Sequence, residues 1–218
     1  MRTLLAATTL LLTSLAAAGC EPDYLINGYD MPDHFPLDGS VRVWEYASTD
    51  SAVLGGLNVE KAGSVVQDDV EVVTLEHWTV SENESEDLAW EVQWSSDDVD
   101  GVRIHGYRNA LTDEEVTFDP PVQFTERNEV PGDQVVTSSG GFNWTATFEG
   151  VDGCATYWVQ DWENAECLII NLDDGDGSPE TNGVIVGSYW LVPRYGTAWM
   201  EVDAYDTLWS LANHQWEP

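Results

Sequence analysis

The chain has 218 residues, of which 40 are acidic and only seven are lysine or arginine, so its formal net charge is −33. A field of this sign repels phosphate backbones and anionic lipid head groups, which excludes nucleic acid as a partner of the folded body. The 11 Trp, 8 Tyr and 5 Phe residues supply apolar area that a disordered acidic chain lacks, so the sequence predicts a folded protein.

The first 19 residues have the layout of a secretory signal peptide. Met1-Arg2 is followed by an apolar stretch from Leu4 to Ala18, which is shorter than the ~20 residues that span a bilayer. Ala17-Ala18-Gly19-Cys20 resembles the lipobox of bacterial lipoproteins, although Ala17 stands where that family prefers Leu. The resemblance implies cleavage before Cys20, a diacylglyceryl group on its thiol and acylation of the new amine. A secreted protein without an anchor is the alternative.

A lipid anchor on Cys20 predicts stable membrane attachment without a transmembrane helix, because several acyl chains together hold firmly. Glu21 follows the cysteine, and the sorting rule of the resembled family then favours the outer membrane. Whether the protein faces the periplasm or the cell surface stays open. Residues 20–33 are polar and irregular and predict a lipidated tether, and residues 34–218 predict a single domain.

From residue 34 onward the pattern is typical of β-strands almost throughout. Alternating or β-branched runs predict strands over 41–46, 70–80, 88–94, 102–107, 116–124, 134–137, 142–148, 166–172, 184–192, 198–202 and 207–216. Turn residues such as Asp100-Gly101 and Pro131-Gly132-Asp133 separate these runs. The last run also fits a short helix, but its alternation favours a strand. We expect an all-β fold of about 10–12 antiparallel strands with little or no helix, either a sandwich or a curved open barrel.

Several segments also resemble uncharacterised β-rich lipoproteins of the bacterial envelope. The matching segments are Phe35-Pro36-Leu37-Asp38-Gly39, Val43-Trp44-Glu45-Tyr46, Thr147 to Gly150 before Cys154, the apolar strand after Cys167, and Ser188-Tyr189-Trp190-Leu191-Val192 before Gly196. They span most of the mature chain, but they are turn and core residues. The resemblance implies a curved antiparallel sheet related to folds that handle lipoproteins or cradle lipids, and it carries over no catalytic residue.

The three cysteines form two groups, Cys20 by itself and Cys154 with Cys167. If Cys20 carries lipid, Cys154 and Cys167 remain as a pair in an oxidising compartment, which predicts a disulfide bridge. Two free thiols or half of a metal site are the alternatives. Twelve intervening residues and no adjacent histidine argue against zinc.

Calcium is the one cofactor that the sequence suggests. Asp173, Asp174 and Asp176 place oxygen donors on a turn with glycines, which suits a hard cation. The EF-hand register is absent, so a solvated acidic turn without a cofactor is the favoured interpretation and calcium is the alternative. Asp97-Asp98-Val99-Asp100-Gly101 is a second, poorer cluster.

Catalytic motifs are absent from the chain, so the sequence predicts a protein that is not an enzyme. There is no Gly-x-Ser-x-Gly elbow, phosphate-binding loop or His-Glu-x-x-His helix. Among the four histidines (His34, His77, His105 and His214), His77 and His105 lie in predicted strands and could meet in space. Glu91, between Trp90 and Trp94, is the first candidate for glycoside hydrolysis, but the sequence favours a carboxylate that faces solvent while its neighbours pack.

Tryptophans in predicted strands are expected to form the core, whereas Trp158, Trp162 and Trp199 are candidates for an exposed ligand-binding surface. The sequence therefore favours an acidic, lipid-anchored envelope protein that acts by binding or as a structural surface component. One alternative is a carbohydrate-active enzyme or carbohydrate-binding module. Another is a carrier of an apolar ligand or lipoprotein, which requires an empty cavity lined by tryptophan.

Overall fold

The computed structural model describes residues 28–37, 41–50, 55–153, 166–175, 182–205 and 207–216. These residues form strands almost throughout, with one four-residue helix, α2, and one 3₁₀ turn, η2. The elements are β1 (Tyr29–Asp30), α2 (Met31–His34), β2 (Val41–Ser48), β3 (Gly56–Gln67), β4 (Val70–Val80), β5 (Glu86–Asp97), β6 (Gly101–Asn109), β7 (Glu114–Thr125), β8 (Asn128–Glu129), β9 (Gln134–Ser139), β10 (Phe142–Gly153), β11 (Glu166–Asp173), β12 (Gly187–Val192), β13 (Gly196–Val202), η2 (Asp203–Tyr205) and β14 (Thr207–Trp216).

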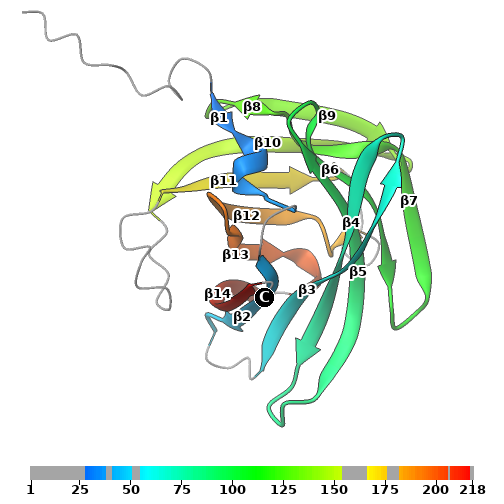
Figure 1. Cartoon of the computed structure of the whole chain (residues 1–218), viewed down its shortest axis with the longest axis vertical. Helices are drawn as coiled ribbons and strands as arrows, with labels where there is room; N and C mark the ends of the chain where they lie inside the picture. The colour runs from blue at the N-terminus through cyan, green and yellow to red at the C-terminus, as the bar shows by residue number, and fades with distance from the viewer. Residues whose placement is uncertain are drawn as a thin grey trace, which may run out of the picture.

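Twelve strands form one antiparallel sheet in the order β7-β6-β5-β4-β3-β2-β14-β13-β12-β11-β10-β9. The chain therefore makes two meanders, β2 to β7 and β9 to β14, which are joined where β14 pairs with β2. The sheet curves until its two edge strands, β7 and β9, come into contact (Figure 1). There the backbone N–H of Gln123 donates to Thr137 Oγ1 over 3.1 Å. The result is a nearly closed, barrel-like shape.

The structure confirms the predicted all-β antiparallel fold, and it selects the curved barrel over the sandwich. All eleven predicted strands are present, and β4 and β14 have the predicted bounds. The last of them is a strand, as its alternation favours. The sequence did not predict β3, which runs from Gly56 to Gln67.

Alternating residues of the strands fill the interior with large apolar side chains. Trp44, Trp94, Trp144, Phe124 and Phe148 are each at most 5% exposed, and their burial contributes roughly 1.5–3 kcal/mol per side chain. The rings meet edge to face, as Trp94 does with Phe124 at 5.3 Å between centroids. The strand tryptophans Trp44, Trp94 and Trp144 thus belong to the core, as expected.

The segment before residue 34 is part of the packed body. Strand β1 pairs with β8, and the ring of Tyr29 meets Phe148 edge-on at 5.6 Å. Met31 is fully buried, and its backbone N–H donates to the carbonyl of Arg127 over 2.8 Å. The expected tether over residues 20–33 therefore overlaps the body, because Tyr29, Asp30 and Met31 already belong to it. Cys20 lies outside the described residues.

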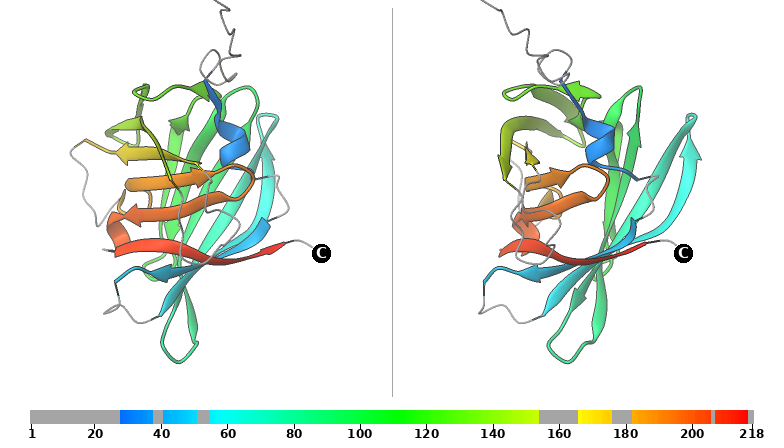
Figure 2. Two further views of the ribbon diagram at one scale, coloured as in Figure 1. Left: turned by 90° about the vertical axis from the view of Figure 1, so that its left-hand side faces the viewer. Right: turned by 60° about the vertical axis from the view of Figure 1, so that its left-hand side comes forward.

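The hairpin of β3 and β4 separates from the rest of the sheet at one end. The pairing of β4 with β5 stops at Val73 and Trp94, whereas β3 and β4 stay paired as far as Gln67 and Val70. Beyond Trp94, β5 pairs only with β6. The tip of the hairpin therefore leans away from β5 (Figure 2).

Candidate functional site

A cleft of about 580 Å³ lies between the tip of hairpin β3–β4 and strands β5 to β7. The hairpin contributes Gln67, Asp68 and Val70 to its lining, and these residues sit where the ladder between β4 and β5 has ended. Clefts of roughly 300–1,000 Å³ are typical of small-molecule sites. The separation of the hairpin thus creates a space large enough for a ligand.

The cleft lies on the outer face of the sheet, opposite the core. Its lining residues alternate along each strand with buried core residues, because successive side chains of a strand point to opposite faces. Gln93 stands between Val92 and Trp94, and Arg103 stands between Val102 and Ile104. On β7, Glu115, Thr117 and Asp119 line the cleft, and Phe118 between them borders both the cleft and the core, where it packs against Trp144.

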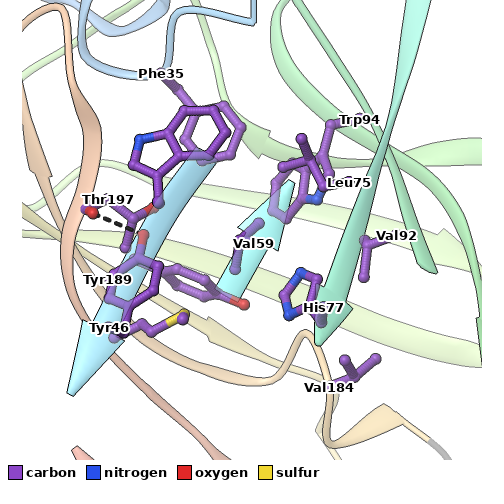
Figure 3. A pocket seen from close by; sticks show the side chains of 12 residues that line it. Phe35, Tyr46, Val59, Leu75, His77, Val92, Trp94, Val184, Tyr189 and Thr197 are labelled. Carbon is purple, nitrogen blue, oxygen red and sulfur yellow. Dashed lines mark hydrogen bonds between the residues drawn. The ribbon is translucent and has the colours of Figure 1, made fainter. Parts of the chain in front are cut away.

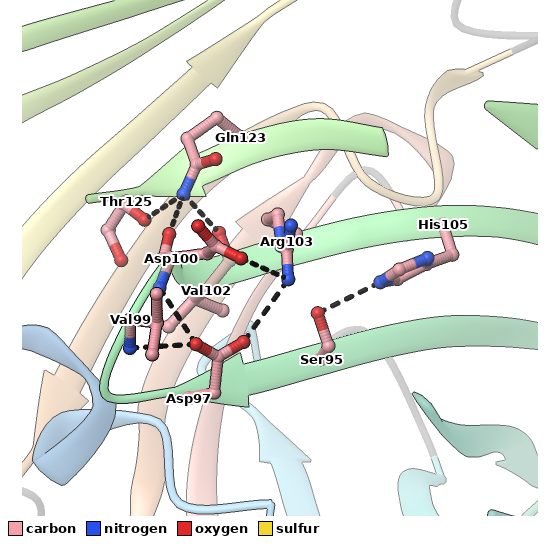
Figure 4. A network of polar contacts seen from close by, with 9 residues as sticks. All are labelled: Ser95, Asp97, Val99, Asp100, Val102, Arg103, His105, Gln123 and Thr125. Atoms are coloured by element: carbon pink, nitrogen blue, oxygen red, sulfur yellow. Dashed lines mark hydrogen bonds and ion pairs between the residues drawn. The ribbon is translucent and has the colours of Figure 1, made fainter. Parts of the chain in front are cut away.

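Arg103 is fixed by two carboxylates at the end of β5 (Figure 4). Its Nη2 lies 3.2 Å from Asp97 Oδ2 and 3.1 Å from Asp100 Oδ2. Asp97 also accepts the backbone N–H groups of Val99 and Asp100, both at 2.8 Å. Desolvation would raise the pKa of Asp97, but the two amide hydrogen bonds and Arg103 outweigh it and hold that pKa below its usual value. The charge of Arg103 is thus already neutralised.

His105 lies beside Arg103 and is 9% exposed. Its Nε2 is 2.9 Å from Ser95 Oγ, and Ser95 is completely buried (Figure 4). Burial, helped by the charge of Arg103, lowers the pKa of His105 below its usual value. The ring is therefore neutral at pH 7.

Three carboxylates line the cleft without a cationic partner. Among the described residues, neither Asp68 nor Glu115 nor Asp119 forms an ion pair. All three side chains are exposed. The cleft therefore combines a neutral, hydrogen-bonding floor at Gln93 and His105 with negatively charged walls.

A second cavity lies inside the sheet, but its volume is only about 40 Å³ (Figure 3). It is lined mainly by apolar and aromatic side chains, among them Phe35, Trp94 and Tyr189. His77 projects into it and lies 3.2 Å from the hydroxyl of Tyr205. Burial lowers the pKa of His77 to about 4. The interior is thus filled by side chains, with room for little more than one water-sized group.

His77 and His105, which lie in strands and could have met in space, do not meet. His77 projects into the interior cavity, whereas His105 lines the outer cleft, so the two rings lie on opposite faces of the sheet. Glu91, the first candidate for glycoside hydrolysis, forms an ion pair with Arg108 on the outer face. Trp94, one of its flanking tryptophans, is buried in the core on the other face. These residues do not share a site.

The acidic turn after β11 has diverging carboxylates. Asp173 Oδ1 accepts the backbone N–H of Gly175 over 2.5 Å, while Asp174 is buried and accepts from Asn182 Nδ2 over 2.8 Å. Asp176 lies outside the described residues. Within the described ranges, no group of three His, Cys, Asp or Glu residues could hold a metal ion. The second cluster is occupied by the guanidinium of Arg103.

The remaining predicted site residues are only partly described. Cys167 is buried in β11, but Cys154 lies outside the described residues, so their bridge stays a prediction. Trp158 and Trp162 also lie outside them. Trp199 is half-buried, and its ring lies 6.3 Å from that of Trp190 between centroids.

The sequence did not predict the cleft because the strand pattern did not predict β3. One signal was present: Asp68-Asp69 separates two β-branched runs, and two-residue loops of this kind connect hairpins. Both residues have positive φ, 49° and 67°, as a type I′ turn requires. That signal predicts the hairpin, but it does not predict that the hairpin leans away from β5.

In the part of the chain that the structure describes, no helix is long and apolar enough to cross a membrane. In comparisons with known proteins, no protein family model, no curated protein and no solved structure matches this chain.

Proposed function

We propose that this chain is a lipid-anchored protein of the bacterial cell envelope that binds a small polar ligand in the cleft under hairpin β3–β4, without catalysing a reaction on it. The observation that carries the proposal is the cleft itself, whose volume of about 580 Å³ falls within the range of small-molecule sites. Its floor of Gln93 and His105 offers a few placed polar groups, as such sites do.

Binding rather than catalysis is favoured by the surroundings of Ser95. Its hydroxyl lies 2.9 Å from His105 Nε2, which is the distance expected of a nucleophile and its base. However, Ser95 is 0% exposed and therefore lies out of a substrate's reach. We interpret this pair as support for the floor of the cleft.

The alternative functions receive less support. A carrier of an apolar ligand needs an interior cavity of several hundred cubic ångströms. The cavity around His77 has a volume of only about 40 Å³, which is too small for such a ligand. Carbohydrate stacking needs an exposed aromatic face, and no tryptophan side chain that the structure describes is exposed.

The cleft can be tested with a variant that fills it. Thr117→Phe places an aromatic ring in the cleft at an exposed strand position without changing the charge. The whole chain, extracted in detergent, is titrated calorimetrically with a panel of small amines, diols, dicarboxylates and sugars. We expect at least one compound to bind the unaltered chain and to lose about tenfold in affinity or more in Thr117→Phe.

Ser64→Phe is the matched control, because Ser64 is exposed on β3 and does not line the cleft. It should leave the affinity unchanged. A panel in which no compound binds, or in which Thr117→Phe binds as well as the unaltered chain, contradicts the proposed site.

The anchor can be tested through Cys20. In a bacterium fed an alkyne-labelled fatty acid, the chain should take up label and sediment with membranes, whereas Cys20→Ala should be unlabelled and remain in the aqueous fraction. Glu21→Asp is the control: it keeps the label, and by the sorting rule of the resembled family it should move to the inner membrane. If the unaltered chain takes up no label, the proposed lipid anchor is contradicted.

A further inference from the structure

The charges around the cleft show which kind of ligand it could bind. Asp68 lies on the hairpin wall, and Glu115 and Asp119 lie on the opposite wall, on β7. None of them has an ion-pair partner among the described residues. Ionised carboxylates only accept hydrogen bonds, so these walls favour a ligand that donates hydrogen bonds.

Arg103 is the cation that lines the cleft, and it is not free to bind an anion. Both Asp97 and Asp100 lie within 3.2 Å of its Nη2, and its side chain is only 18% exposed. An anionic ligand would have to displace these carboxylates while facing three more. The cleft therefore disfavours phosphates and carboxylates.

His105 supplies an observation independent of the acidic walls. The residue is 9% exposed, and one ring nitrogen, Nε2, is held by Ser95. The other nitrogen, Nδ1, has no hydrogen-bond partner among the described residues, and it is not completely shielded from solvent. A nine-tenths buried imidazole that lines the cleft thus keeps one ring nitrogen accessible and without a partner among the described residues.

We infer that the cleft binds a small organic cation with two amino groups, a diamine or short polyamine, an inference that rests on the proposed function. One ammonium group contacts Glu115 and Asp119, the second contacts Asp68 across the cleft, and the polar floor of Gln93 and His105 faces the chain between them. The net charge of −33 raises the local concentration of such cations and speeds their capture.

Three probes, each with four carbon atoms, test the inference: the diamine putrescine, the diol 1,4-butanediol and the diacid succinate. Each is titrated calorimetrically into the whole chain in detergent at about 0.15 M salt, where the Debye length of roughly 8 Å suppresses diffuse counterion binding. We expect putrescine to bind at one saturable site, with the diol and the diacid at least tenfold weaker.

Charge-matched double variants separate this site from the acidic surface as a whole. Glu115→Gln with Asp119→Asn should weaken putrescine binding about tenfold or more. Glu82→Gln with Glu149→Gln makes the same change in net charge at exposed positions outside the cleft lining, and should leave the affinity within about twofold. An equal loss in both double variants overturns the inference, because it indicates diffuse binding of cations.

The two proposals fail in different ways. If 1,4-butanediol or succinate binds as tightly as putrescine and Thr117→Phe abolishes that binding, the amine assignment is overturned while the proposed site stands. If Thr117→Phe leaves the binding of every probe unchanged, the site itself is overturned.

Discussion

His77 is a polar side chain in an otherwise apolar interior. Its ring projects into the small cavity together with Val59, Leu75 and Val92, and it lies nearly parallel to the ring of Tyr205 at 6.3 Å between centroids. A buried imidazolium would lack solvation there, which is why the pKa of His77 falls to about 4. The ring therefore stays neutral in the folded chain over a pH range in which the unfolded chain takes up a proton.

This difference predicts a loss of stability in acid. As the pH falls from 6.5 to 4, the unfolded state binds a proton at residue 77 and the folded state does not, which disfavours folding by on the order of 3 kcal/mol. His77→Gln retains a group able to bond Tyr205 but does not titrate. The free energy of unfolding of both chains is measured in urea from pH 7 to pH 4. That of His77→Gln should increase relative to that of the unaltered chain as the pH falls.

The comparison must be made as a difference between the two chains, because Glu129 acts in the opposite sense. Burial raises the pKa of Glu129 to about 7, so its contribution to stability increases as the pH falls from 7 towards 4.5. It is common to both chains and cancels in the difference. A difference that does not change with pH would contradict the burial of a neutral His77.

At the scale of elements, the tip of hairpin β3–β4 depends on its two-residue turn. Asp68 and Asp69 adopt φ values of 49° and 67°, in the left-handed region that glycine occupies without cost. Asp69→Gly should therefore stabilise the turn by up to about 1 kcal/mol, whereas Asp69→Ala should destabilise it. Hydrogen exchange at the backbone amides of the tip, such as Gln67 and Val70, should slow in the first variant and quicken in the second. Equal exchange in both variants would contradict the left-handed turn.

The elements also show what local sequence can and cannot predict. The run that forms β4 is rich in β-branched and aromatic residues, and its bounds were predicted correctly. By contrast, β3 contains Lys61-Ala62-Gly63-Ser64, whose small and polar residues lack a strand pattern, and it becomes a strand because β4 pairs along its whole length. Such pairing between segments is not visible in a single run of residues.

The candidate site depends still more on contacts between strands. The cleft exists because the β4–β5 ladder ends at Val73 and Trp94, beside a β-bulge at Gln93 and Trp94. The sequence suggested that Asp97 and Asp100 could be ligands of a cation. The cation that they bind is the guanidinium of Arg103, at the start of the next strand. Residue types alone indicated a charged site and could not show that its charge was already satisfied.

At the scale of the whole molecule, the net charge of −33 is spread over a body with few cations. Arg42, Arg103, Arg108 and Arg127 each already form an ion pair with a neighbouring carboxylate. The remaining carboxylates repel one another over the curved sheet, and folding brings them closer together than in the unfolded chain. Stability should therefore depend on the salt concentration.

Raising NaCl from about 0.1 M to 1 M shortens the Debye length from roughly 10 Å to 3 Å and screens this repulsion. We expect the midpoint of thermal unfolding to rise by about 5 °C or more, which corresponds to a gain of roughly 1–2 kcal/mol for a chain of this size. The increase should level off with concentration and be similar for NaCl and KCl, because screening depends on ionic strength rather than on the identity of the ion. A midpoint that stays constant or falls would show that the acidic surface is already compensated in the folded state.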